Sequence, residues 1–153
     1  MSLYLETTQI PAERTAGEIS LLLVKSGASQ ISTEYDASHK IRALRFILGV
    51  QGRPTVFSLP VRCEPIFNRL QKQRARLSNR TAKTGEDRAQ AERIAWRQLF
   101  RWVQAQLALI ETGMVEAGEV FMPYIESGGI TLYQHMLNSG GLKQLSGSNT
   151  VTT

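Results

Sequence analysis

The first part of the chain changes from a helical spacing of hydrophobic residues to a strand-like one. Ile19, Leu22 and Leu23 recur at helical spacing, and Gly27 follows them at a position typical of a helix end. The segment Thr15–Glu18 has the form of a capping box, in which a hydroxyl and a carboxylate three positions apart bind the free amides of a first turn. We therefore predict an N-terminal helix that starts at this box.

Three stretches of alternating hydrophobic and polar residues follow and predict β-strands. Turn sequences separate them at residues 36–39 and 51–54, and Pro60 ends the third because proline donates no hydrogen bond within a sheet. The alternating positions are Ile31, Thr33 and Tyr35; Leu44, Phe46, Leu48 and Val50; and Thr55, Phe57 and Leu59. Together they predict an antiparallel meander with one buried face.

Helical periodicity returns after the strands. Pro65 suits the first turn of a helix with apolar residues Ile66, Leu70 and Leu77. A second pattern, the longest in the chain, starts at the acidic pair 86–87, where a helix dipole favours negative charge. Its apolar stripe is Ala91, Ala95, Leu99, Trp102, Val103, Leu107 and Ile110.

Glycine and proline residues divide the rest of the chain. Gly113 is a point where the long helix bends or breaks, and Pro123 limits it on the far side. A short last helix lies between Ser127–Gly129 and Gly140. The predicted fold class is α+β: an N-terminal helix, a three-stranded antiparallel meander, then C-terminal helices including one long helix packed on the sheet. We expect a single domain over residues 1–145 and a flexible polar tail over 146–153.

Charge is distributed unevenly along the 153 residues, whose net charge is +5. Residues 1–103 hold 17 basic and 9 acidic side chains, whereas residues 104–153 hold 1 basic and 4 acidic ones. Between Arg69 and Arg101 there are ten basic and three acidic residues. Such polarity favours an anionic partner at one end, or self-association of unlike surfaces into a homo-oligomer.

Arg93, Arg97 and Arg101 recur at every fourth position of the long helical pattern, an arrangement called here the arginine ladder. The spacing stacks three guanidinium groups on one helix face, and no carboxylate lies three or four positions from any of them. Like charges four apart cost a helix about 0.2–0.5 kcal/mol per pair. Compensation must therefore come from elsewhere, either from an anionic ligand or from carboxylates of the same protein or a second copy. The candidate carboxylates are Glu111, Glu116 and Glu119.

The ligand interpretation predicts a phosphate-binding face, because the planar guanidinium fork donates two parallel hydrogen bonds to phosphate. The predicted contacts for nucleic acid or another polyphosphate are Arg93, Arg97 and Arg101, with Arg74, Arg76 and Arg80 steering. Such binding is salt-dependent and mostly independent of base sequence. Trp96 and Trp102 lie in the same stretch. We place Trp102 in the core and Trp96 at its half-buried rim, in preference to base stacking.

The residues that carry catalysis in other proteins are sparse here. His39 and His135 lack metal-ligand spacing, and Cys63 follows a strand beside an arginine that would lower its thiol pKa. Packing is the favoured role for this cysteine. Glu116 and Glu119 share a helix face and would suit a metal, although a solvated face is the favoured interpretation. We therefore predict a protein that is not an enzyme and uses neither cofactor nor metal.

Several features of the sequence bear on the cellular compartment of the protein. The single cysteine fits a reducing compartment, the N-terminus has neither the basic nor the apolar region of a secretion signal, and no apolar run reaches the roughly 18–20 residues that span a bilayer. These features predict a soluble cytoplasmic protein with no membrane partner.

The runs Ala91–Met114 and Glu119–Tyr124 resemble small proteins encoded in phages and prophages. The segments Gly27–Ala28, Glu34–Asp36 and Phe57–Val61 are similar to the same group, so that the resemblance covers about residues 6–145. It implies a phage accessory protein and assigns no catalytic residue. The first hypothesis is an accessory protein that binds nucleic acid or polyphosphate through a basic helix face. The alternative is a protein-interaction module that inhibits a host enzyme or defence complex, including by capture of a nucleotide signal.

Overall fold

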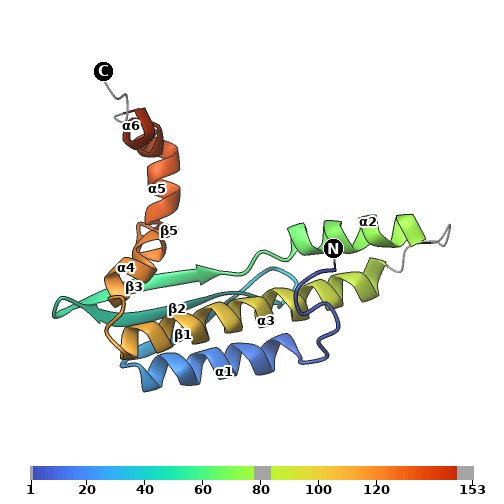
Figure 1. The fold of residues 1–153 in the computed structure, drawn as a ribbon, viewed down its shortest axis with the longest axis horizontal. Coiled ribbons are helices and arrows are strands. Elements are labelled where there is room, and N and C mark those ends of the chain that lie inside the picture. Colours follow the sequence, from blue (N-terminus) through green and yellow to red (C-terminus); the bar gives the residue numbers. More distant parts are fainter. Residues whose placement is uncertain (1, 78–83, 148–153) are drawn as a thin grey trace.

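The computed structural model describes residues 2–77 and 84–147 (Figure 1). Its elements are α1 (Ala12–Lys25), β1 (Gln30–Tyr35), β2 (Ile41–Val50), β3 (Arg53–Pro60), α2 (Glu64–Leu77), α3 (Thr84–Glu111), α4 (Ala117–Phe121), the 3-10 turn η1 (Met122–Tyr124), β4 (Glu126–Ser127), β5 (Ile130–Thr131), α5 (Leu132–Ser139) and α6 (Gly141–Gly147). This order confirms the predicted α+β fold, with an N-terminal helix, three strands and one long helix among those that follow.

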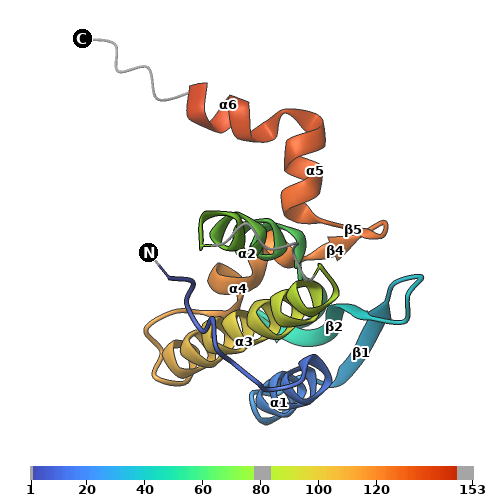
Figure 2. The ribbon, with the colours of Figure 1, turned by 90° about the vertical axis from the view of Figure 1, so that its right-hand side faces the viewer.

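The three strands form an antiparallel sheet in the order β1-β2-β3. Helices α1 and α3 pack against each other and lie across one face of this sheet (Figures 1 and 2). Alternate residues of β2 and β3 point into the layer between sheet and helices, and their buried members are Leu44, Phe46, Leu48, Phe57 and Leu59. The predicted meander with one buried face is confirmed.

The core is built around a cluster of aromatic rings. Phe46 and Phe57 stack with ring centroids 5.3 Å apart, and Phe121 of α4 packs edge-on against Phe46 at 5.5 Å. Trp96 is only 1% exposed and belongs fully to the core, so the prediction that it lies at the rim is wrong. Trp102 instead holds the rim, half-buried against Phe121. Trp96 is buried because α3 packs against both α1 and the sheet, so that the buried face of α3 is wider than the single apolar stripe read from the sequence.

Helix α1 starts one turn earlier than predicted, with Pro11 as its N-cap. Thr15 is fully buried inside the helix, and its hydroxyl has no hydrogen-bond partner among the described residues, so the predicted capping box is wrong. The physical reason is burial: Ala12 and Ala16 extend the apolar stripe of Ile19 one turn towards the N-terminus. The hydroxyl of Thr15 is therefore buried, and the carboxylate of Glu18 does not cap the helix and can make another contact.

The predicted turn at residues 51–54 is shorter in the structure, because Gln51 and Gly52 alone carry the reversal with positive φ angles of 49° and 77°. Two left-handed residues are the usual loop of a tight hairpin. Pro54 therefore belongs to β3, which tolerates proline because it is an edge strand.

The last part of the chain leaves the body of the molecule. Helix α3 ends at Glu111, and Gly113 has the left-handed φ of 78° that breaks the helical path there. Helices α5 and α6, called here the arm, project away from the sheet (Figures 1 and 2). The chain continues past Gly140 as α6 instead of ending its helical structure there; residues 146–147 of the predicted tail belong to α6, and 148–153 lie outside the described residues. In the described ranges, no helix is both long and apolar enough to cross a lipid bilayer.

Candidate nucleic-acid interface

The arginine ladder of α3 is compensated inside the chain at its central member. The guanidinium of Arg97 donates to the carboxylate of Glu18 on α1, with 2.6 Å between Nη1 and Oε2. The Arg97 side chain is only 12% exposed, and its guanidinium carbon lies 4.2 Å from the ring centroid of Phe100. This arginine joins α1 to α3 and has little surface left for a ligand.

Glu18 is the residue that the sequence interpretation missed. It was assigned to a capping box, whereas in the structure it accepts from Arg97 and, at 3.3 Å, from Arg14 one turn earlier on α1. The hydrogen bond from Arg97 lowers the pKa of Glu18 below its ordinary value, which outweighs the opposing effect of burial. The carboxylate is thus held in its charged form beside the arginine.

The carboxylates predicted to neutralise the ladder have other surroundings. Glu119 accepts from the backbone N–H of Glu116 at 3.0 Å and so caps the first turn of α4. This contact also accounts for the pair that was considered as a metal site. Within residues 2–77 and 84–147, no group of three or more histidine, cysteine, aspartate or glutamate side chains is placed to hold a metal ion.

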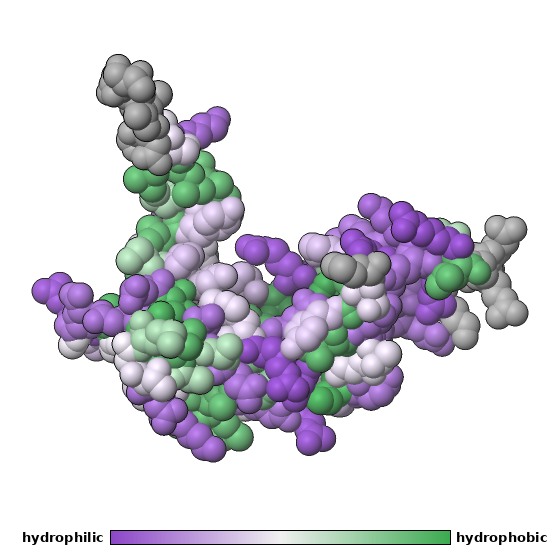
Figure 3. Space-filling model, in the orientation of Figure 1, coloured by the Kyte–Doolittle hydropathy of each residue, from purple (hydrophilic) through white to green (hydrophobic). Residues whose placement is uncertain are grey.

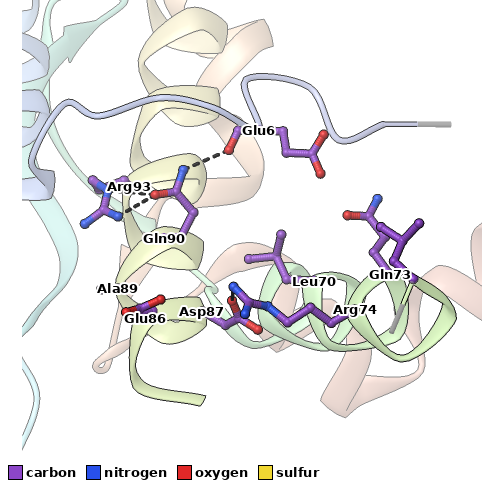
Figure 4. Close-up of a pocket in the computed structure, with 10 residues that line it drawn as sticks. Glu6, Leu70, Gln73, Arg74, Glu86, Asp87, Ala89, Gln90 and Arg93 are labelled. Atoms are coloured by element: carbon purple, nitrogen blue, oxygen red, sulfur yellow. Dashed lines mark hydrogen bonds and ion pairs between the residues drawn. The ribbon is translucent and has the colours of Figure 1, made fainter. Parts of the chain in front are cut away.

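The outer members of the ladder are bound by glutamines. Arg93 donates to the side-chain oxygen of Gln90, and the side-chain Nε2 of Gln90 donates to the carbonyl of Glu6 at 2.8 Å (Figure 4). The same Nε2 also donates to the carbonyl of Thr8 at 3.0 Å. Arg101 donates to Gln104 at 3.1 Å and is the exposed end of the ladder. Arg93 therefore helps to hold the N-terminal segment against α3.

The three steering arginines are separated by the structure. Arg74 points inward from α2 and lies 2.7 Å from the carboxylate of Asp87, which is 3% exposed and also accepts from Gln71 at 2.7 Å (Figure 4). This buried carboxylate ties α2 to the first turns of α3. Arg76 faces solvent, whereas Arg80 lies outside the described residues.

A second basic stripe lies on α2 and was not recognised as a unit from the sequence. Arg69, Lys72 and Arg76 are spaced i, i+3 and i+7, which places them within about 60° of one another around the helix axis. We call these three residues the outer α2 face. All three are exposed, while Phe67 on the opposite side of the helix is buried against the body. The i, i+3, i+7 spacing is the signal that predicts this face.

No carboxylate lies on the same side of α2 as the outer α2 face. The other exposed residues on this side are Pro65, Asn68 and Ala75. In the part of the chain that the structure describes, neither Lys72 nor Arg76 has an ion-pair partner. Many other cations of the body are paired. Ion pairs within the described residues include Arg14–Glu18, Lys40–Glu92, Arg42–Asp36, Arg45–Glu126, Arg74–Asp87, Arg88–Glu64 and Arg97–Glu18.

A groove of about 580 Å³ separates α2 from the start of α3 and the N-terminal segment (Figure 4). Its walls include Arg74 and Arg93 but also Glu6, Glu86 and Asp87. Carboxylates and guanidinium groups alternate around it, so the groove does not offer a uniformly positive lining. An anion is therefore better placed on the outer α2 face than inside this groove.

The remaining candidates for chemistry have structural roles. Burial raises the pKa of the Cys63 thiol to about 11, which outweighs any lowering by nearby cations, so the thiol is protonated at neutral pH. His135 bonds through Nε2 to the backbone oxygen of Ser127 at 2.7 Å. His39 occupies the β1–β2 turn with a φ of 60°. Asp36 shapes that turn by accepting from the backbone N–H groups of residues 38 and 40 at 2.8 and 3.0 Å.

Comparison with known proteins identifies no relative: no family model, curated protein or solved structure matches the chain.

Proposed function

We propose that the protein is a non-enzymatic accessory protein that binds nucleic acid or another polyphosphate through the outer α2 face. The observation that carries the proposal is a helix side with three exposed cations and no carboxylate. This position replaces the arginine ladder as the main contact, because Arg97 is paired with Glu18. The proposed setting is the cytoplasm of a bacterial host cell.

The geometry of the stripe suits a row of phosphates. Arg69 and Arg76 are seven residues apart, which corresponds to about 10 Å along a helix. One nucleic-acid strand carries a phosphate about every 3.4 Å along a duplex axis, so the stripe spans about three of them. Lysine and arginine without internal partners release condensed counterions when they bind such a row.

The anchoring of α2 supports this role. Arg74 and Asp87 fix the inner side of the helix, and this contact holds the outer cations in a common direction. The sequence also places Arg80 and Lys83 shortly after α2, which raises the basic charge near its C-terminal end. Binding should then be weakly sequence-dependent, because phosphate contacts carry no direct base information.

The test compares two double variants that remove the same charge. K72Q/R76Q removes two of the three exposed cations of the outer α2 face, and R53Q/R62Q removes two exposed cations on and after β3. Fluorescence anisotropy with labelled 20-nucleotide single-stranded and duplex DNA, at low salt, should show about tenfold or greater weakening for K72Q/R76Q. The control should change affinity by less than about threefold. Equal losses in both variants, or none in either, would overturn the proposal.

A further inference from the structure

The arm has no core of its own. Helix α5 has eight residues and α6 has seven, and neither contains a buried residue. Helices shorter than about 12–15 residues are marginal in water unless an apolar face is packed against something. Within the described residues, the main contacts of the arm with the rest of the chain are near its base, where α5 meets η1 and β5. Its outer part therefore lacks the packing that usually stabilises helices of this length.

The arm instead presents apolar side chains to solvent. Tyr133 and Leu137 lie one turn apart on α5, and Leu142 and Leu145 lie three residues apart on α6, with exposures between 39 and 61%. In the space-filling view the projecting part of the molecule shows hydrophobic areas beside weakly polar ones (Figure 3). Lys143 is the single Lys, Arg, Asp or Glu residue among 132–147. Such a surface favours contact with an apolar partner.

A groove with a partly apolar wall lies on another part of the same chain. It runs between the C-terminal halves of α1 and α3, measures about 520 Å³, and is walled by Leu22, Leu107, Ala108 and Ile110. Lys25 and Glu111 stand at the same groove. Within the described residues, Glu111 forms no ion pair and neither does Lys143.

We propose that the arm of one copy docks into the α1–α3 groove of a second copy. The apolar side chains of the arm match the apolar part of the groove wall, which Ser26 and Gln104 also line, and Lys143 and Glu111 are opposite in charge. The arm rises from the side of the molecule opposite to α1, so it points away from the groove of its own chain (Figures 1 and 2). The occupant that the structure favours is therefore a neighbouring copy.

The contact is heterologous, because two different surfaces meet. After the first contact the pair still has one free arm, on one copy, and one free groove, on the other, so association continues until a ring closes or an open chain forms. This differs from a twofold arm-to-arm dimer, in which association stops at two copies. The inference does not depend on polyanion binding by the outer α2 face.

The first experiment measures mass by sedimentation velocity from low to high micromolar concentration. The parent should form species heavier than the 17.1 kDa monomer. L137E/L145E should weaken association at least about tenfold. The matched control Q134E/Q144E adds the same charge at exposed polar positions of the same two helices and should associate like the parent. A parent that stays monomeric, or a control that dissociates equally, would overturn the proposal.

The groove is tested with A108R, which places a charge in its wall at an exposed helical position. A105R adds the same side chain one turn earlier at an exposed position outside the groove wall and serves as its control. A108R should become monomeric while A105R associates. Circular dichroism confirms that each variant keeps the helix content of the parent, so that loss of association is not loss of folding.

Mixing the two association-defective variants distinguishes arm-in-groove contact from arm-to-arm contact. L137E/L145E has an intact groove and A108R has an intact arm, so one productive contact remains between them. The mixture should form a 1:1 dimer and no larger species, although each variant alone is monomeric. If A108R alone still dimerises, or the mixture stays monomeric, the arm does not dock into the groove and the proposal is wrong.

Discussion

Helices α2 and α3 each carry three basic residues along one side, yet the two sets have opposite surroundings. On α3, Arg97 is 12% exposed and donates to Glu18 at 2.6 Å. On α2, Lys72 and Arg76 face solvent with no carboxylate on their side of the helix. The difference comes from packing, because α3 packs beside α1 on one face of the sheet whereas α2 packs mainly on α3. Helical spacing shows which side chains share a face, and the neighbouring elements decide whether that face is available to a ligand.

The comparison predicts that the α3 set supports folding. Replacing Arg97 with alanine removes a charge-assisted hydrogen bond, leaves Glu18 without its main partner and exposes the ring of Phe100. We expect R97A to lower the free energy of unfolding by about 2 kcal/mol in urea denaturation. K72Q/R76Q should change it by less than about 0.5 kcal/mol. An R97A protein as stable as the parent would remove the distinction between the two sets.

A second variant sharpens the comparison by loosening α2 without changing its outer side. Asp87 is buried and accepts from Arg74 and Gln71, so D87N replaces a charged acceptor by a neutral amide beside a guanidinium. We expect a loss of about 1–2 kcal/mol, with faster amide hydrogen exchange confined to residues 64–77 and the first turns of α3. E34Q, at an exposed strand position, is the matched control. Uniform acceleration across the sheet would contradict the local role of Asp87.

The smallest expected effect is a dependence on pH. The hydrogen bond from Arg97 lowers the pKa of Glu18 in the folded protein below its ordinary value of 4.5, so the unfolded chain takes up a proton first as the pH falls. The stabilisation is complete above about pH 4.5 and disappears as the pH falls through the lowered pKa.

Thermal unfolding between pH 7 and pH 2.5 measures this contribution. The stability difference between the parent and E18Q should shrink over the acidic part of the range. Asp36, whose pKa is lowered by the backbone N–H of Lys40, remains in both proteins and does not affect the difference. A difference that is constant with pH would show that the charge of Glu18 contributes nothing to its contact with Arg97.

The strands and their order were predictable because period-two alternation is a local signal. Apart from Ala43, the buried positions of β2 and β3 follow the alternation read from the sequence. The start of α1 was not predictable from the sequence, because the local capping pattern at Thr15 competed with burial of Ala12 and Ala16. This burial is seen only in the assembled core. Propensity and capping signals are overridden when an extra turn of helix buries apolar side chains.

The site was predictable only in part. Arg97 and Glu18 are 79 positions apart in the chain, and no spacing rule pairs residues on helices separated by a whole sheet. The cations of the outer α2 face, by contrast, follow the i, i+3, i+7 pattern of a single helix, so their common direction was readable from the sequence. That Lys72 and Arg76 form no ion pair among the described residues could be seen only from the positions of the surrounding elements.

The salt dependence of DNA binding tests the central claim most directly. The slope of log affinity against log salt counts the phosphate contacts made by cations, at about 0.7–0.9 per contact. K72Q/R76Q should reduce the magnitude of this slope by about 1.4–1.8, corresponding to two lost contacts. R93Q/R101Q removes the same charge from the arginine ladder and should leave the slope almost unchanged. If the ladder variant loses the slope and the α2 variant keeps it, the assignment of the binding face to α2 is contradicted.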